Sequence, residues 1–409
     1  MSFTKKIIVS MVLGIILGVF INLIDISQSS THSIIINGLD LVSHLFLSAL
    51  KLIIIPLIFF SIVCGIVSLS EDVSISRLGI KTISLYLVTT VIAISLGLLF
   101  ASLISYEPVL VTDLNSEINV KDMQSENNFF PNNIFKSMVD GNIIHLLIFS
   151  ILIGISASRI KEKIKTFIKY VHEFNEVINE LVRIIISFTP LAVFCILSKT
   201  FATQGLDTLM PLMGYFMTVT AVLLLHFFIT FSLLLKIFTR LDPIIFYRNI
   251  KDVLVFTFST SSSSASIPFT LKTANEKCGV DKSISTFSIP LGATINMDGT
   301  AIMQGCATFF LASLYGIDLG INEILTIVIT ATIASIGTAG IPSAGIIMLT
   351  VIFTQIGIPL EGITLLLGVD RLLDMMRTSV NVSGDLCISC IVASSENKLD
   401  HNTFKSSCL

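Results

Sequence analysis

Long apolar segments alternate with short polar ones along most of the chain. A helix needs about 20 apolar residues to cross a bilayer, and eight segments approach or exceed that length. The pattern predicts spans over 7–23, 38–69, 80–105, a fourth that ends before Arg159, then 174–197, 209–238, 283–311 and 362–393. Pro56 and Pro190 are expected to bend the second and fifth spans. Gly14 and Gly18 of the first span have the spacing that permits close helix contact.

Two later apolar segments are interrupted by small and polar residues. Segment 253–271 contains FSTSSSSASIP, and segment 325–353 contains SIGTAGIPSAG. Non-helical backbone at membrane depth is tolerated only where protein or a wet cavity covers it, so both are predicted to be re-entrant hairpins. Each precedes a span, which indicates an inverted repeat with a midplane binding site. The predicted fold is an all-α membrane protein with eight transmembrane helices and two re-entrant hairpins; two further full spans are the alternative.

Composition agrees with a polytopic membrane protein. The chain is 53% hydrophobic and 13% charged, and its mean hydropathy is +0.90. Its net charge of −3 gives no indication of a nucleic-acid partner. The seven cysteines lie mostly in apolar segments, so structural disulfides are not expected. Cys387 and Cys390 form a CxxC inside a predicted span and are interpreted as packing residues.

The distribution of charge predicts the topology. Acidic residues outnumber basic ones in the long polar loop 106–142, whereas Lys and Arg cluster in the connections after the fourth and sixth spans. By the positive-inside rule these two connections are cytoplasmic, and so are both termini. Lys5 and Lys6 precede the first apolar run without a cleavage site, so this run is expected to be a span rather than a removed signal. The expected location is the plasma (inner) membrane.

Ionisable side chains follow one face of the last predicted span. Asp370, Asp374, Arg377, Asn381 and Asp385 recur at helical spacings within an arc of roughly 80°. Such groups are costly in lipid, so this face is expected to contact protein, water or a ligand. Arg371 lies at its edge, and the carboxylates still outnumber the guanidinium groups. A network of ion pairs between helices is one interpretation; bound cations are favoured because negative charge is left over.

The seventh predicted span carries a second polar interruption, GATINMDGT at 292–300. Backbone carbonyls freed by such a break are natural Na⁺ ligands, and Asn296 and Asp298 supply side-chain oxygens. In the third span, Tyr86, Thr89 and Thr90 form a hydroxyl cluster that also suits a hard cation.

With these motifs the sequence resembles the dicarboxylate/amino acid:cation symporters, the glutamate transporter family. The resemblance is carried by the serine run 261–264, NMDGT at 296–300, SIGTAGIPSAG at 335–345 and DxxxDxxRTxxNVxGD at 370–385. It implies a homotrimer with a separate pathway in each protomer. Residues 1–240 would be mainly scaffold and trimerisation spans, with the third span contributing to transport; 241–395 would be the core transport region, and 396–409 a cytoplasmic tail.

The resemblance also assigns the substrate site. Arg377 is expected to pair with a side-chain carboxylate of the substrate and Asp374 with its amino group. The main-chain carboxylate and amine are assigned to Asn381, Thr378, Ser262 and Ser263, with Thr300 and Gly345 completing the site. Some members have an arginine directly before a serine triplet, where this chain has Ser261. Arg371 is interpreted as a compensating arginine.

Three cation sites follow from the same resemblance. The first comprises Asp385 with backbone of Gly292, Asn296 and Asn381. The second comprises Tyr86, Thr89, Thr90, Asn296 and Asp298. The third comprises Thr294 with backbone of Ser335, Ile336 and Thr338. The coupling ion is Na⁺ or H⁺, and no other cofactor is expected.

The predicted function is import of L-glutamate or L-aspartate by cation symport, and the protein is not expected to be an enzyme. C4-dicarboxylate and cystine symport are the alternatives within the family; relatives that carry C4-dicarboxylates usually lack the aspartate corresponding to Asp374. An intramembrane serine hydrolase would need a base beside the serine run, and His44, His145 and His226 lie in segments without a motif. A passive channel is the other alternative, but a dense polar site of mixed charge suits binding and occlusion of a substrate better than a continuous pore.

Overall fold

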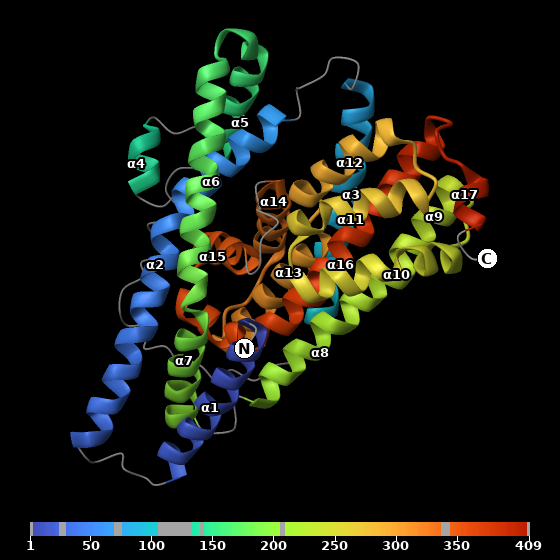
Figure 1. The fold of residues 1–409 in the computed structure, drawn as a ribbon. Helices are drawn as coiled ribbons and strands as arrows, with labels where there is room; N and C mark the ends of the chain where they lie inside the picture. Colours follow the sequence, from blue (N-terminus) through green and yellow to red (C-terminus); the bar gives the residue numbers. More distant parts are fainter. Residues whose placement is uncertain are drawn as a thin grey trace.

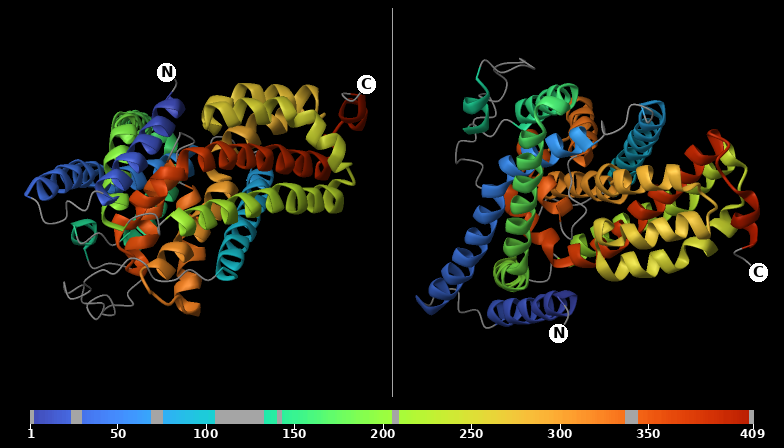
Figure 2. Two further views of the ribbon diagram at one scale, coloured as in Figure 1. Left: turned by 90° about the horizontal axis from the view of Figure 1, so that it is seen from below. Right: turned by 45° about the horizontal axis from the view of Figure 1, so that its top comes forward.

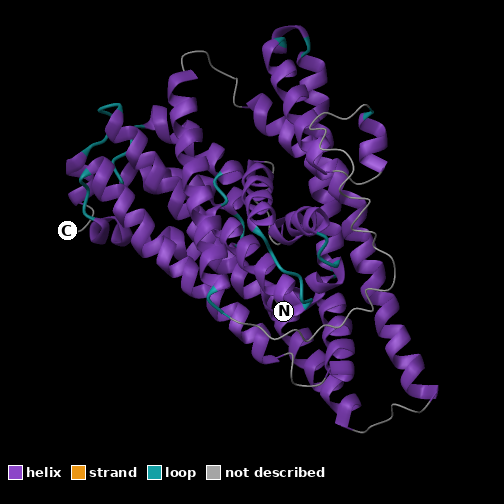
Figure 3. Cartoon of the chain, turned by 180° about the vertical axis from the view of Figure 1, so that it is seen from behind, coloured by secondary structure: helices purple, strands orange, loops and turns teal. Residues whose placement is uncertain are grey.

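The computed structural model describes residues 3–23, 30–68, 76–104, 133–139, 143–204, 209–336 and 344–406. Within these residues the chain is helical, apart from loops and one isolated bridge between Val280 and Leu399 (Figure 3). The sequence-based expectation of an all-α protein is confirmed for the described residues.

The first helices form one side of the molecule (Figure 1). They are α1 (Phe3–Leu23), α2 (Ser30–Ser68), α4 (Ile134–Val139), α5 (Ile143–Arg159), the 3₁₀ helix η4 (Lys161–Lys163), α6 (Lys165–Ser187) and α7 (Thr189–Gln204). Helix α2 runs through Pro56 and contacts α5, α6 and α7. Most of the acidic loop, 105–132 and 140–142, lies outside the described residues.

Helix α1 packs closely against α7, as the glycine spacing predicts. A Cβ added at Gly14 would lie 2.8 Å from the carbonyl oxygen of Phe194, and one at Gly18 would lie 2.6 Å from the carbonyl oxygen of Ser198. Any larger residue would therefore push the two backbones apart. The predicted kink of the fifth span is also confirmed, because α6 and α7 are bent by 46° beside Pro190. The bent pair α6–α7 is longer than the predicted span 174–197, because it begins at Lys165 and ends at Gln204.

Among the described residues, two helical segments are individually long and apolar enough to cross a bilayer, Leu78–Ser102 within α3 and Met210–Thr239. The bent pair α6–α7 would be a third. Helix α3 covers Ser76–Ser102. The other segment comprises α8 (Leu209–Leu225), a π-helical turn η6 (His226–Thr230) and α9 (Phe231–Thr239). Single π turns are frequent at functional sites.

The helices after residue 240 are arranged around α16 (Ile363–Ser395). They are α10 (Pro243–Thr260), α11 (Ser263–Glu276), α12 (Lys282–Ile295), α13 (Asp298–Leu314), α14 (Ile321–Ile336), α15 (Ala344–Ile356) and the 3₁₀ helix η7 (Leu360–Gly362). Figure 2 shows α16 between the pair α10–α11 and the segment α8–α9. Helix α16 also contacts α3, α12 and α13, so its polar face is enclosed by other helices.

The two interrupted segments fold back on themselves. Helices α10 and α11 contact each other and are joined by only Ser261 and Ser262, so the serine run lies at the tip of a hairpin. Helices α14 and α15 also contact each other. The connection between them, 337–343, lies outside the described residues. Both hairpins extend further toward their open ends than 253–271 and 325–353 because their outer turns are too polar to stand out in an apolar pattern.

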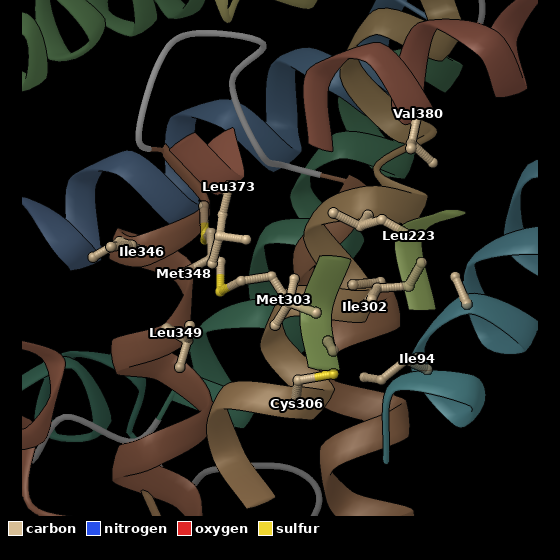
Figure 4. Packing of buried hydrophobic residues seen from close by; sticks show 14 of the residues in the cluster. Ile94, Leu223, Ile302, Met303, Cys306, Ile346, Met348, Leu349, Leu373 and Val380 are labelled. Atoms are coloured by element: carbon tan, nitrogen blue, oxygen red, sulfur yellow. The ribbon is translucent and has the colours of Figure 1, made fainter. Parts of the chain in front are cut away.

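Helix α13 forms the centre of the hydrophobic core. In Figure 4, Ile302 and Met303 of α13 are packed among Ile94 of α3, Leu223 of α8 and Met348 of α15. A Cβ at Gly97 of α3 would lie 2.7 Å from the carbonyl oxygen of Ile302, so these two helices approach closely. This packing holds the break between α12 and α13 against α3.

The chain after α16 returns to the first hairpin. The amide of Asp281 donates to the carbonyl of Lys398, and the amide of Asp400 donates to the carbonyl of Gly279. Helix α17 (His401–Ser406) buries Phe404, whose carbonyl accepts a hydrogen bond from Asn249 of α10. The segment predicted as a tail is therefore attached to the open end of the α10–α11 hairpin as far as residue 406.

Candidate functional site

The polar face of α16 is buried. Asp370, Asp374, Arg377, Asn381 and Asp385 are all less than 7% exposed. The helix is continuous through all five, so the predicted spacing does place them on one side. Charged groups are rarely this buried unless they are paired or hold a ligand.

Arg377 has two hydrogen-bonded partners and two donors left over. Its Nη2 donates to Asp370 Oδ1 and to Asp374 Oδ1, each at 2.8 Å. Its Nε and Nη1 are buried and have no hydrogen-bond partner among the described residues. Leaving a buried donor unpaired is costly, and guanidinium groups pair readily with carboxylates. The free side of Arg377 is therefore suited to an anionic ligand.

Gly345 and Thr300 lie beside this free side. A Cβ built on Gly345 would lie 3.2 Å from Arg377 Nη1 and 2.8 Å from Thr300 Cγ2. Only glycine leaves this approach to the guanidinium open. The structure thus brings together Arg377, Thr300 and Gly345, as predicted, from α16, α13 and the start of α15.

Asp374 lies between two arginines. Besides its contact with Arg377, its Oδ2 accepts from Arg371 Nη1 at 3.4 Å. Arg371 is itself buried, which places it inside the site rather than at the lipid surface. Thr378 is also buried and donates from its hydroxyl to the carbonyl of Asp374.

The serine tip of the first hairpin has a left-handed turn. Ser261 has φ 51°, and Ser262 caps α11 by accepting from the amide of Ala265 at 3.2 Å. Ser263 is buried at the start of α11, a helix that contacts α16. The hydroxyl of Ser261 is buried and has no hydrogen-bond partner in the described part of the chain. The tip thus supplies hydroxyl groups that are not all used internally.

The residues assigned to the first cation site form a connected cluster. Asn296 Nδ2 donates to Asp385 Oδ1 at 2.9 Å and to the carbonyl of Asn381 at 3.1 Å. A Cβ at Gly292 would overlap the Asp385 carboxylate and would lie 2.7 Å from the Tyr86 hydroxyl. Asp385, Gly292 and Tyr86 therefore meet at one point. The sequence grouped Tyr86 with the second site, and the structure places it here as well.

Asp298 is the centre of the second cluster. Its Oδ1 accepts from Thr90 Oγ1 at 2.8 Å and from Thr89 Oγ1 at 3.3 Å. The Thr89 hydroxyl also lies 3.4 Å from Asn296 Oδ1. Carboxylate, hydroxyl and amide oxygens are the ligands that hard cations take in proteins. All four residues were predicted for this site, and the structure brings them together.

His226 is a member of this cluster that the sequence analysis missed. Its Nε2 lies 3.2 Å from Asp298 Oδ2, and both side chains are fully buried. The residue begins the π-helical turn η6, whose changed helical register has no signature in an apolar segment. The sequence analysis considered His226 only as a possible base for the serine run and assigned it no role at a cation site. A histidine within an otherwise apolar span was the only available signal.

The third predicted cation site is described only in part. Thr294 lies on α12 and Ser335 and Ile336 at the end of α14, two helices that contact each other. The Thr294 hydroxyl donates to the carbonyl of Leu291 at 2.9 Å, and Ser335 is buried. Thr338 lies outside the described residues.

Negative charge exceeds positive charge at the centre of the molecule. Four buried carboxylates, those of Asp298, Asp370, Asp374 and Asp385, face two buried guanidinium groups, those of Arg371 and Arg377. Two negative charges are therefore unmatched by these guanidinium groups. Such an excess is compensated by bound cations or by protons, and the surrounding oxygen atoms suit Na⁺.

The long apolar helices and the buried charged residues define a helical membrane protein. The profile of the Sodium:dicarboxylate symporter family matches residues 3–395, and the chain belongs to this family. The family consists of membrane transporters rather than enzymes.

Several characterised relatives align along nearly the whole chain. The proton/glutamate-aspartate symporter of Escherichia coli (strain K12) is 31% identical over 98% of this chain and 94% of its own length. The proton/sodium-glutamate symport protein of Bacillus caldotenax is 29% identical over 96% of this chain and 95% of its own. The excitatory amino acid transporter 3 of Mus musculus is 31% identical, with coverage of 92% and 82%.

Proposed function

We propose that this protein is a secondary active transporter that imports L-glutamate or L-aspartate by symport with Na⁺ or H⁺. The observation that carries the proposal is Arg377, a buried guanidinium with two unpaired donors beside Asp374. A ligand with a side-chain carboxylate satisfies the first group and an α-amino group satisfies the second. The names of the relatives from Escherichia coli and Bacillus caldotenax support the same class of substrate.

Asp374 distinguishes amino acids from plain dicarboxylates. A C4-dicarboxylate without an amino group would leave this carboxylate facing another carboxylate, which is unfavourable in a buried site. Cystine symport remains an alternative within the family and is tested by direct competition. For a hydrolase, a base is needed beside Ser261–Ser264, and His226 is instead engaged with Asp298.

The cations would bind at the clusters of Asp385 and Asp298, with a third site that Thr294, Ser335, Ile336 and Thr338 complete. Bound cations would offset the excess negative charge and hold the break between α12 and α13 in place. Substrate and cation would then stabilise each other's binding, and linkage requires this effect to be reciprocal.

The proposed architecture has eight spans and two re-entrant hairpins, with both termini cytoplasmic in the plasma (inner) membrane. Three protomers would assemble through residues 1–240, and 241–395 would move as an elevator-type transport region. The contacts of α8 and α9 with α16 favour counting the sixth span, like the third, with the moving part.

Uptake into proteoliposomes tests the function. Purified protein is reconstituted, and Na⁺ and pH gradients are imposed separately while radiolabelled L-glutamate, L-aspartate, succinate and cystine are offered. We expect accumulation of an acidic amino acid above equilibrium under at least one gradient. Uptake that never exceeds equilibrium, and persists without a gradient, would instead indicate a passive channel.

The second hairpin is proposed as the extracellular gate. A spin label at Ala344, the first residue of α15, should lose mobility when coupling ion and substrate are both present, and less with either alone. Equal mobility in the empty and doubly bound protein would contradict the gate. Because binding of both ligands is verified in the same sample, this result would leave the transport function itself intact.

A further inference from the structure

A cleft of about 490 Å³ opens between the α8–α9 span and the first hairpin helix. Phe228 and Ser232 line it from the span, and Ile244, Tyr247, Arg248 and Lys251 line it from α10. None of these residues belongs to the buried polar site around α16. The cleft is therefore a separate feature of the outer surface.

The wall of the cleft is aromatic and fixed. The rings of Phe228 and Tyr247 have centroids 5.4 Å apart, and the Tyr247 hydroxyl lies 3.0 Å from Ser232 Oγ. Tyr247 also donates to the backbone carbonyl of Phe227. Tyrosine and phenylalanine in this arrangement present a rigid apolar surface with a polar edge, which is typical of side chains at a membrane interface.

The rim of the cleft is positively charged. Arg248 and Lys251 are one helical turn apart on α10, are exposed, and have no carboxylate within 4.0 Å in the described part of the chain. Of the two acidic side chains nearby, Asp252 is paired with Lys277 at 2.6 Å, and Asp242 caps α10 by accepting from the amide of Ile244. The positive charge of the rim is thus available to an anion.

The cleft lies where the polar end of the hairpin meets its apolar surface. Asn249, next to Arg248, donates at 2.8 Å to the carbonyl of Lys277, just beyond the end of α11. One turn past Lys251, Val255 is 72% exposed, and Phe228 across the cleft is 53% exposed. Exposed apolar side chains in a membrane protein face acyl chains, so bases at this level lie at the depth of lipid headgroups.

We propose that this cleft binds an anionic phospholipid of the adjacent leaflet, which the positive-inside rule identifies as the cytoplasmic one. Arg248 and Lys251 hold the phosphate, and an acyl chain lies along Phe228 and Val255. The proposal goes beyond transport of an amino acid and is independent of which substrate or coupling ion is used.

Binding of fluorescent phosphatidylglycerol to the purified full-length protein, in a neutral detergent, tests the site. Arg248→Gln combined with Lys251→Gln should raise the Kd about 30-fold, the factor expected for losing about 1 kcal/mol from each of two interfacial bases. Arg248→Lys combined with Lys251→Arg keeps both charges and should restore most of the affinity.

A charge-matched control separates this site from general attraction. Lys272→Gln combined with Lys282→Gln removes two exposed bases outside the cleft, one near the end of α11 and one at the start of α12, and should leave the Kd unchanged. An equal loss in the control, or an unchanged Kd in the Arg248/Lys251 variant, would overturn the proposal. Displacement of the lipid by millimolar glycerol 3-phosphate would also overturn it, because the occupant would then be a soluble phosphate. Lipid binding is measured without transport, so its failure is distinguishable from failure of the proposed function.

Discussion

Replacing Arg377 by cysteine removes the group that we assign to the substrate's side-chain carboxylate. Arg377 uses one nitrogen, Nη2, for both Asp370 and Asp374, and its Nε and Nη1 have no hydrogen-bond partner among the described residues. Losing one partner of a desolvated charge pair costs about 2 to 5 kcal/mol, which corresponds to roughly 30-fold to 5,000-fold in affinity. We expect a loss of L-aspartate and L-glutamate affinity within this range.

The structure also predicts a side effect of this substitution. Without Arg377, the carboxylates of Asp370 and Asp374 remain buried together on one face of α16. Part of the loss of substrate affinity in Arg377→Cys is therefore expected from the repulsion between these two carboxylates rather than from the missing contact with the ligand. Arg377→Lys separates the two effects, because it keeps a positive charge for the aspartates and loses the planar fork that binds a carboxylate with two hydrogen bonds. It should fold normally and still bind acidic amino acids more weakly than the wild type.

Isothermal titration calorimetry at saturating coupling ion measures both variants. Retained cation binding shows that the site is intact, and serine or alanine as ligand tests whether Arg377→Cys admits neutral amino acids. If both acidic substrates bind Arg377→Cys and Arg377→Lys as tightly as wild type, the assignment of Arg377 to the substrate is wrong.

Three further predictions concern the cation sites and the second hairpin. Asp385→Asn removes the counter-charge of the first proposed cation site and should abolish the Na⁺ dependence of substrate binding. Asp374→Asn should instead weaken amino acid binding and leave cation binding in the absence of substrate intact. Titrations that show the same defect in both variants would contradict this division of roles. His226→Leu removes one partner of the buried Asp298 and should raise the Na⁺ concentration for half-maximal substrate binding at least several-fold, since an unsatisfied buried group costs about 1 to 3 kcal/mol. His226→Gln should retain most of the Na⁺ affinity. Equal Na⁺ dependence in both variants and the wild type would refute a role of His226 in cation binding. Gly345→Ala places a methyl group against the free side of the Arg377 guanidinium and should lower substrate affinity about tenfold or more. Gly38→Ala, with nothing within 4 Å of the new carbon, should leave substrate affinity unchanged. If the two variants have the same calorimetric Kd for substrate, no ligand binds beside Gly345.

The sequence by itself determined the all-helical class of the fold and the polar residues that share the buried face of α16. Apolar block lengths and interrupted segments predicted helices and hairpins because lipid forces every backbone polar group to be satisfied within a helix or beneath protein. The 3.6-residue period was enough to place Asp370, Arg377 and Asp385 on one face of α16, since spacing within a single continuous helix translates directly into direction.

Only the tertiary structure decided which groups from different helices meet. His226 reaches Asp298, 72 residues away, because a π-helical turn changes the direction of the side chain and α8 packs against α13. Tyr86 lies at Gly292 and Asp385 rather than only with Thr89 and Thr90, because α3 crosses the break between α12 and α13. The cleft of Arg248 and Lys251 likewise requires α9 and α10 to lie side by side. Periodicity specifies the direction of a side chain within one helix, whereas the packing of several helices at once selects the partner that it meets.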